Sequence, residues 1–173
     1  MEKKEILQIL KECDAIQFGR FVLTSGAVSD YYIDIKKAIT NPKALKKIAE
    51  AMAEYAVGYD VLAGMELGAV PLVVALSLET EIPYVIIRKE KHEHGTGKQI
   101  EGEDVKNKKV LVIEDVTTSG GSVVKTIQIL RENNAQVDKV VAVVNRESEV
   151  KEKLQKLNVN FISLISVNDI LKK

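Results

Sequence analysis

The amino-acid sequence predicts a doubly wound α/β fold, in which a mainly parallel sheet carries helices on both faces. Several short segments are apolar throughout, as expected of strands that are buried on both faces. Amphipathic helical segments alternate with these strands along the chain. The 173 residues, 46% of them hydrophobic, suffice for one well-packed domain and are too few for two full ones. We therefore expect a single domain over residues 1–173, with a small β-rich hood over roughly residues 1–40 and the core over roughly residues 41–173.

The N-terminal segment predicts one helix and two short strands outside the main sheet. Apolar residues recur at helical spacing, which predicts an amphipathic helix from about Lys3 to Cys13. The stretches "RFVLTSG" and "DYYIDI" then predict two strands around a Ser-Gly turn. Asn41 and Pro42 are typical of a helix start, and the regular part of the chain begins there.

From this point the helical and strand patterns alternate. We expect, in order, a helix over 42–57, the strand "DVLAGM", a helix over 70–78, the strands "YVIIRK" and "KKVLVIED", a helix over 122–133, the strand "KVVAVVNR", a helix near 149–157, the strand "VNFISLI" and a short terminal helix. The polar segment "EKHEHGTGKQIEGEDVKNK" interrupts this order and has neither a helical nor a strand period. A stretch of this length without structure is usually a functional lid or an insertion, so we expect a mobile loop.

Charge and cysteine content exclude several classes of protein. Lysine and arginine number 25, and aspartate and glutamate also number 25, so there is no basic field for nonspecific nucleic-acid binding. The lone Cys13 has no partner for a disulfide or a zinc cluster, which suits a reducing compartment. The start "MEKKEILQIL" is charged, and no apolar run approaches the ~20 residues that cross a bilayer. We expect a cytoplasmic protein that binds neither nucleic acid nor membranes.

The stretch "VLVIEDVTTSGGS", residues 110–122, carries the most specific chemical signal. A strand ends there, and the loop "TTSGGS" offers hydroxyls and unhindered N–H groups to an anion, before a helix whose N-terminus adds its dipole. The loop has no lysine after its glycines and is therefore not a P-loop, and it is not a G-x-G-x-x-G turn. An ordinary helix cap is the alternative. Glu114 and Asp115 favour a ligand that also carries hydroxyl donors, which indicates a sugar phosphate.

These residues resemble the 13-residue signature of the type I phosphoribosyltransferases, an apolar strand followed by two acids, an apolar residue and a Thr/Ser/Gly loop. The resemblance implies the fold of that family. It also implies that Glu114 and Asp115 bind the ribose 2- and 3-hydroxyls of 5-phosphoribosyl 1-diphosphate, and that the loop wraps its 5-phosphate. Within this stretch, the residues implied for this ligand are Glu114, Asp115, Val116, Thr117, Thr118, Ser119, Gly120, Gly121 and Ser122, and the full set adds Arg88, Lys89, Lys91, His92 and His94.

Two further stretches resemble the orotate-specific members of this family. In "FGRFVLTSGAVSDYYIDIKKA" the matching residues are Phe21, Leu23, Ser25, Gly26, Tyr31 and Tyr32. The resemblance implies a hood over the base, with Ser25, Tyr31 and Tyr32 near orotate together with Thr118. The alternative is a hairpin whose tyrosines only pack on the core. Arg146 ends the strand "KVVAVVNR", where the family has an arginine, and a guanidinium can pair with the carboxylate of orotate in two parallel bonds. Its alternative role is a surface arginine at a strand end.

The segment "RKEKHEHGTGKQIEG" resembles the family loop that clamps the diphosphate from across a dimer interface. The resemblance implies a homodimer in which residues 88–105 reach the neighbouring site, with Arg88, Lys89 and His94 on the diphosphate. The family usually has a lysine where this chain has His92, so either Lys91 shifts into that role or His92 performs it. We predict Arg88, Lys89, His92 and Asp115 as the catalytic residues. An exposed charged loop that is only solvated is the alternative.

The activity implied is transfer of the 5-phosphoribosyl group to orotate, which gives orotidine 5'-phosphate and diphosphate. Mg²⁺ is expected with the diphosphate, touching Asp115 only through water, with no direct protein ligand. Two alternatives remain: transfer to another base, and a non-catalytic regulator of transcription that binds the same activated sugar. Such a regulator would need a DNA-binding element, and the predicted helix over residues 3–13 has no basic face.

Overall fold

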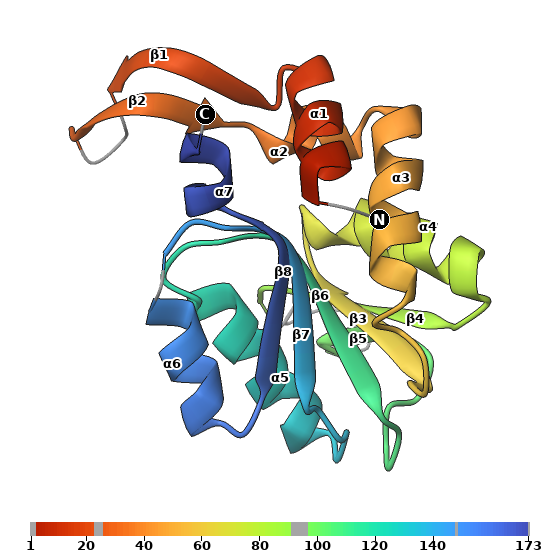
Figure 1. The fold of residues 1–173 in the computed structure, drawn as a ribbon. Coiled ribbons are helices and arrows are strands. Elements are labelled where there is room, and N and C mark those ends of the chain that lie inside the picture. The colour runs from red at the N-terminus through yellow and green to blue at the C-terminus, as the bar shows by residue number, and fades with distance from the viewer. Residues whose placement is uncertain (1–2, 23–25, 91–96, 148, 173) are drawn as a thin grey trace.

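The structure confirms the doubly wound α/β fold. It is a computed structural model that describes residues 3–22, 26–90, 97–147 and 149–172. Six strands form one sheet in the order β5-β4-β3-β6-β7-β8 (Figure 1). The strands are β3 (Val61–Met65), β4 (Tyr84–Ile87), β5 (Ile100–Gly102), β6 (Val110–Thr117), β7 (Lys139–Asn145) and β8 (Asn160–Ser166). Neighbouring strands are parallel except β5, which pairs antiparallel with β4.

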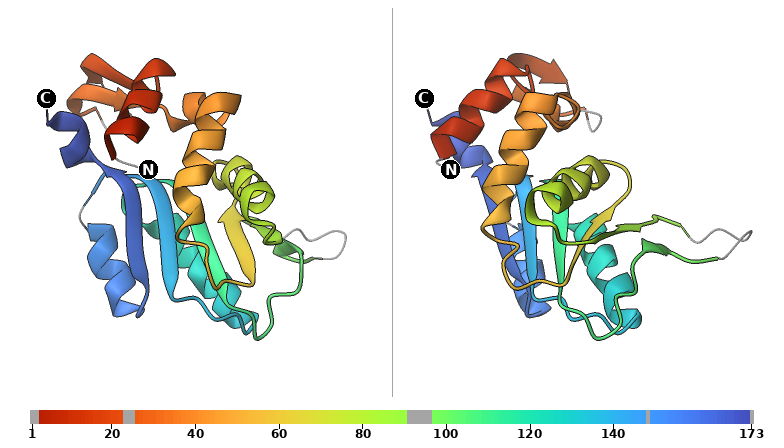
Figure 2. Two further views of the ribbon diagram at one scale, coloured as in Figure 1. Left: turned by 45° about the vertical axis from the view of Figure 1, so that its right-hand side comes forward. Right: turned by 90° about the vertical axis from the view of Figure 1, so that its right-hand side faces the viewer.

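Helices cover both faces of this sheet, as the apolar strands predicted (Figures 1 and 2). Helices α1 (Lys3–Glu12), α3 (Pro42–Ala53) and α4 (Ala69–Thr80) share one hydrophobic cluster, and α5 (Gly121–Glu132) and α6 (Glu149–Lys156) share the other. Successive strand residues alternate between them: Leu111 and Ile113 of β6 pack with the first cluster, and Val110 and Val112 pack with the second. Each such buried side chain contributes roughly 1.5–3 kcal/mol to folding.

A separate two-stranded hood lies above the carboxyl edge of the sheet (Figure 1). Strand β1 (Ile16–Val22) starts earlier than predicted and pairs antiparallel with β2 (Val28–Ile33). The predicted second strand ran to Ile35, but the structure ends β2 sooner and begins a short helix, α2 (Ile35–Ile39). Its buried residues Ile35, Ala38 and Ile39 have helical spacing, and burying them together explains the difference.

The C-terminal helix α7 (Val167–Leu171) completes the region beside the hood. Ser166 and Asp169 form a capping box at its start, and the Lys3 ammonium lies 3.0 Å from an Asp169 carboxylate oxygen. This ion pair joins α1 to α7, so the two ends of the described chain meet near the hood. Within the residues described, no helix is long and apolar enough to cross a membrane.

The prediction of a loop without structure between β4 and β6 is wrong for residues 100–102. These residues form β5, which pairs through Ile87 with Ile100 and through Ile86 with Glu101. A three-residue strand is too short to show an alternating pattern in the sequence, and β5 is extended because it pairs with β4. We call residues 88–105 the arm; of its described part, residues 100–102 pair with β4 at the side of the sheet.

Candidate functional site

The predicted site residues gather at the carboxyl edge of the sheet. Because β3, β4, β6 and β7 are parallel, the loops that follow them emerge at the same edge, where open α/β sheets bind ligands. Glu66 follows β3, Arg88 follows β4, the phosphate loop follows β6 and Arg146 follows β7. The topology thus brings together segments that are far apart in sequence.

The acidic pair at the end of β6 is held by backbone hydrogen bonds. Glu114 is only 7% exposed, and its carboxylate accepts a hydrogen bond from the Asp115 N–H at 3.1 Å. Asp115 in turn accepts one from the Val116 N–H at 2.8 Å. Burial and the neighbouring Asp115 carboxylate raise the pKa of Glu114 to about 8, while the charge of Lys89 acts in the opposite direction. Two adjacent carboxylates in this setting favour a ligand that brings hydrogen-bond donors or positive charge.

Gly68 lies against a predicted site residue, Asp115, and sequence reasoning missed it. A Cβ atom at this position would lie 2.0 Å from a carboxylate oxygen of Asp115, which no real contact allows. The absence of a side chain therefore lets the loop after β3 lie directly against Asp115. The peptide bond between Glu66 and Leu67 in the same loop is cis. The stretch "GMELGAVP" contains this glycine, but only the fold shows that it faces the acidic pair.

The predicted phosphate loop lies between β6 and the start of α5. Thr117 is buried, and its hydroxyl donates to the Asn145 side chain at 2.9 Å, which fixes the end of β6 to β7. Gly120 adopts a left-handed conformation with φ +79° directly before the helix, a conformation that favours glycine. The loop surrounds a pocket of about 210 Å³, lined by Glu114, Val116, Thr117, Thr118, Ser119, Gly120, Gly121, Ser122 and Val123. A cavity lined by loop amides at a helix N-terminus suits an anion.

The base of the arm is fixed by contacts from three directions. The Arg88 side chain forms an ion pair with Glu101 of β5 at 3.0 Å. The Lys89 N–H donates to the Glu66 carboxylate at 2.8 Å, and the Lys125 ammonium of α5 donates to the Lys89 carbonyl. Arg88 and Lys89 therefore stand at the carboxyl edge, as predicted. Glu66 and Lys125 were not predicted, because contacts between separate loops leave no signal in the local sequence.

Several predicted residues lie outside the described part of the chain. These are Ser25 of the hood, and Lys91, His92 and His94 of the arm. Their roles, and the choice between Lys91 and His92, stay predictions.

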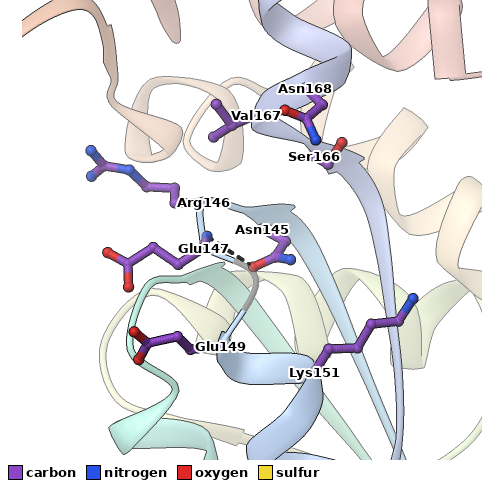
Figure 3. Close-up of a pocket in the computed structure, with 8 residues that line it drawn as sticks. All are labelled: Asn145, Arg146, Glu147, Glu149, Lys151, Ser166, Val167 and Asn168. Carbon is purple, nitrogen blue, oxygen red and sulfur yellow. Dashed lines mark hydrogen bonds between the residues drawn. The ribbon is translucent and has the colours of Figure 1, made fainter.

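The predicted base-binding residues occupy two places. The backbone N–H of Arg146 donates to the Thr117 carbonyl at 2.9 Å, and its side chain extends away from Asn145 and Lys151 (Figure 3). In the hood, Tyr31 is partly buried against the core, as the packing alternative expects. Tyr32 is 42% exposed, with its ring 5.6 Å from that of Phe21.

A larger pocket of about 570 Å³ lies beside Arg146, between the ends of β7 and β8 and the starts of α6 and α7 (Figure 3). It is lined by Asn145, Arg146, Glu147, Glu149, Lys151, Ser166, Val167 and Asn168. Asn145 connects it with the phosphate loop, since its side-chain oxygen accepts from Thr117 and from the Glu147 N–H.

A parallel sheet with an acidic pair and a glycine-containing loop at its carboxyl edge defines a class, the phosphoribosyl transferases. The family model for the phosphoribosyl transferase domain matches residues 36–169. The match includes the sheet and both loops described above and leaves most of the hood outside.

Comparison with individual proteins narrows this class. An orotate phosphoribosyltransferase of Pyrococcus horikoshii is 51% identical over 174 residues, covering 98% of this chain and 94% of the relative. The structure of Mycobacterium tuberculosis orotate phosphoribosyltransferase with Fe(III) dicitrate has a TM-score of 0.86 at 28% identity, covering 98% of both chains. A structure of the same enzyme with 5-phospho-α-D-ribosyl 1-diphosphate has a TM-score of 0.78 at 25% identity, covering 97% of this chain and 98% of that one. The chain belongs to the orotate phosphoribosyltransferase family.

Proposed function

We propose that this protein transfers the 5-phosphoribosyl group from 5-phosphoribosyl 1-diphosphate to orotate, giving orotidine 5'-phosphate and diphosphate. The observation that carries the proposal is the acidic pair, with Glu114 buried and Asp115 half-buried, placed directly before a loop that contains the left-handed Gly120. A bare phosphate would be repelled by two carboxylates, whereas a ribose phosphate presents hydroxyls to them and its phosphate to the loop. The names of the relatives support orotate as the acceptor.

The activated sugar is held by β6 and the loop that follows it. Glu114 and Asp115 accept hydrogen bonds from the ribose 2- and 3-hydroxyls. The residues from Val116 to Ser122 surround the 5-phosphate, with backbone N–H groups and the dipole of α5 facing the charge. The 210 Å³ pocket of the loop supports this assignment.

The diphosphate is neutralised by the base of the arm. The Lys89 backbone is held against Glu66 of its own chain, and the charge of Lys89 opposes the rise in the pKa of Glu114. We therefore assign the Lys89 ammonium to the site of its own chain. Arg88 points to the other side of the arm, toward Glu101, and must exchange that ion pair for a diphosphate contact. His94, together with Lys91 or His92, completes the clamp, so that Arg88, Lys89, His92 and Asp115 carry the catalysis.

Mg²⁺ fits the acidic pair by the chemistry of its donors. A hydrated Mg²⁺ ion presents water hydrogens that carboxylate oxygens can accept, so the acidic pair can hold the ion without binding it directly. When bound, Mg²⁺ supplies positive charge to the departing diphosphate. In this proposal Asp115 orients the ion through water.

Orotate lies between the phosphate loop and the hood. Arg146 pairs with its carboxylate, and Thr118, Ser25, Tyr31 and Tyr32 surround the ring. The reaction needs no side-chain nucleophile, because N1 of the base displaces diphosphate directly from the ribose. The protein contributes by aligning the two ligands and stabilising the charge that develops on the leaving group.

The protein acts as a cytoplasmic homodimer of one-domain chains, with the arm of each chain in the site of the other. Helix α4 is apolar around its circumference, and such helices are normally covered. Leu78 on α4 is 81% exposed, and Leu67 in the loop before it is 74% exposed. The described parts of the arm lead away from the body of the molecule (Figure 2). A second copy on the α4 face would cover these side chains.

The direct test is the ultraviolet absorbance of orotate. Absorbance should fall only when 5-phosphoribosyl 1-diphosphate and Mg²⁺ are both present, and diphosphate should appear in equal amount. Consumption of adenine, guanine or uracil in place of orotate would instead support transfer to another base. Binding of the activated sugar without turnover of any base would support the regulator.

Shared sites are tested by mixing inactive variants under conditions of subunit exchange. Arg88→Ala with Asp115→Ala should recover about a quarter of wild-type activity, since half of the dimers are mixed and each has one intact site. Lys89→Ala with Asp115→Ala is the matched control, and it should recover nothing because both residues act in the same site. Equal recovery, or none, in the two mixtures would contradict sharing through the arm.

A further inference from the structure

Helix α6 packs against the outer side of the phosphate loop. Val150 on its first turn is fully buried, and a Cβ atom added at Gly120 would lie 3.4 Å from a Val150 methyl group. On the next turn, the Lys153 ammonium donates a hydrogen bond to the Ser119 carbonyl at 2.7 Å. Lys153 also lies 3.5 Å from the Glu149 carboxylate of the same helix. The loop therefore has a charged contact from a helix that is not part of the signature motif.

This contact fixes the orientation of one peptide group in the loop. The Ser119 carbonyl and the Gly120 N–H belong to the same trans peptide unit, and they point in opposite directions. Because the carbonyl faces Lys153 on α6, the Gly120 N–H faces away from α6. The pocket of the loop lies on that side, since it is lined by residues 114 and 116–123 and by no described residue of α6. The Gly120 N–H is thus aimed at the position of the anion.

The ammonium group also changes the strength of this donor. A positive charge on the carbonyl polarises the peptide unit, and hydrogen bonds in a chain strengthen one another. A P-loop carries a lysine within its own motif, whereas the loop of residues 117–122 contains none. Lys153 supplies positive charge to the loop from the opposite side, through the backbone.

We propose that Lys153 is a positioning residue for the 5-phosphate, acting through the Ser119–Gly120 peptide. The inference rests on the proposed function, because it assigns the loop to that phosphate. The Lys153 side chain is 44% exposed, and its ion pair with Glu149 lies at the surface, where such pairs contribute little to stability. Replacement should therefore weaken ligand binding while leaving the fold intact.

The experiment compares three variants of the full-length protein by titration calorimetry. Lys153→Met removes the charge, Lys153→Arg keeps a charged donor, and Lys156→Met is the matched control. Lys156 is exposed on the same helix, and its side chain makes no hydrogen bond or ion pair with any described residue. The probes are ribose 5-phosphate, which carries the 5-phosphate, and inorganic pyrophosphate, which does not.

Lys153→Met should bind ribose 5-phosphate about three- to tenfold more weakly, as expected for loss of a partly exposed charged hydrogen bond. Its affinity for pyrophosphate should be unchanged. In steady-state assays its KM for 5-phosphoribosyl 1-diphosphate should rise by a similar factor, while the KM for orotate and kcat stay within about twofold. Lys153→Arg should restore most of the affinity, and Lys156→Met should behave as wild type.

The inference would be overturned by wild-type affinity of Lys153→Met for ribose 5-phosphate, or by an equal loss in Lys153→Arg. A loss of pyrophosphate affinity as large as that for ribose 5-phosphate would also contradict it, because the effect would then be general. If the wild-type protein binds no ribose 5-phosphate, the loop assignment itself fails. That outcome is distinct from a failure of the role of Lys153.

Discussion

The carboxylates at the two edges of the central sheet, where the strands begin and where they end, have opposite environments. At the amino edge, the Tyr59 hydroxyl donates to Asp138 at 2.6 Å, and the Lys109 ammonium lies 3.3 Å from the same carboxylate. Lys109 and Lys139 also lie over the Tyr59 ring, at 4.7 and 5.1 Å from its centre. Although burial opposes it, hydrogen bonds from Tyr59 and Lys109 lower the pKa of Asp138. Here the protein satisfies its own charges.

At the carboxyl edge, the acidic pair of Glu114 and Asp115 makes no ion pair within the described residues and is left for a ligand to satisfy. Glu114 stands beside a second carboxylate, and burial with this neighbour raises its pKa to about 8. Gly68 keeps the space next to Asp115 free of a side chain. Such an arrangement costs stability when no ligand is bound, which is the usual signature of a functional region. The comparison predicts that equivalent substitutions at the two edges have opposite effects on activity and stability.

The largest effect is expected from Asp115→Asn. In the proposed site this change removes a charged acceptor for the ribose and for hydrated Mg²⁺, so kcat/KM should fall on the order of 100-fold. Above about pH 8, where Glu114 is ionised, the free energy of unfolding should stay equal or rise, because a like charge next to Glu114 is lost. Steady-state kinetics and urea denaturation of the same preparation measure both quantities. Near-normal kcat/KM would remove Asp115 from the site.

Gly68→Ala should have the next largest effect. The added methyl group would overlap the Asp115 carboxylate, so that carboxylate must move. A displacement of about 1 Å in a catalytic group can reduce the rate about 100-fold, and we expect a loss of roughly 10- to 100-fold in kcat. The assay should be accompanied by far-UV circular dichroism, so that a folded but slow enzyme is distinguished from an unfolded one.

The two edges should also differ in the pH dependence of stability. The pKa of Glu114 is about 8 in the folded protein and 4.5 ordinarily, so the folded state keeps a proton that the unfolded chain releases. The free energy of unfolding should therefore fall as pH rises from about 4.5 to about 8, by at most about 1.4 kcal/mol per pH unit. The pKa of Asp138 is lowered, so its contribution is lost in the other direction, as pH falls below its ordinary value of 3.8.

Urea denaturation of wild type and Glu114→Gln, compared at about pH 5 and about pH 8, isolates the contribution of Glu114 to the pH dependence of the free energy of unfolding. The variant should gain on wild type as pH rises. If the two curves run parallel over this range, Glu114 does not hold a raised pKa. A parallel comparison with Asp138→Asn should show no divergence above about pH 5, because Asp138 is already ionised there.

The smallest effect is expected from Asp138→Asn at the amino edge. It weakens the contacts with Tyr59 and Lys109, and the free energy of unfolding should fall by about 1 kcal/mol, because the pair is partly exposed. Values of kcat and KM should match wild type. A kinetic defect as large as that of Asp115→Asn would abolish the distinction between the edges.

The sequence predicted the regular parts of the fold and the placement of the continuous part of the candidate site at the end of a strand. Strands such as "KVVAVVNR" are apolar throughout, and only a sheet covered on both faces explains that pattern. The signature from Glu114 to Ser122 is contiguous, so its local arrangement follows from strand, loop and helix. The short elements α2 and β5 were missed, because three to five residues hold no measurable period.

The remaining site residues could not be predicted, because their roles depend on distant contacts. Gly68 matters through Asp115, and Lys125 and Glu66 matter through the backbone of Lys89. Lys153 reaches Ser119 across 34 positions of sequence. In the sequence these are an ordinary glycine and ordinary charged residues of loops and helices.

The short strand β5 has a further consequence for the behaviour of the protein at high concentration. Without β5, the apolar strand "YVII" of β4 would be the outermost strand of the sheet, and it could pair along its length with a strand of another molecule. β5 is the outermost strand in its place, and it has only three residues, one of them a glycine and another the charged Glu101. An edge that is short and charged offers little to an incoming chain, so the segment that begins the arm also protects the sheet against aggregation.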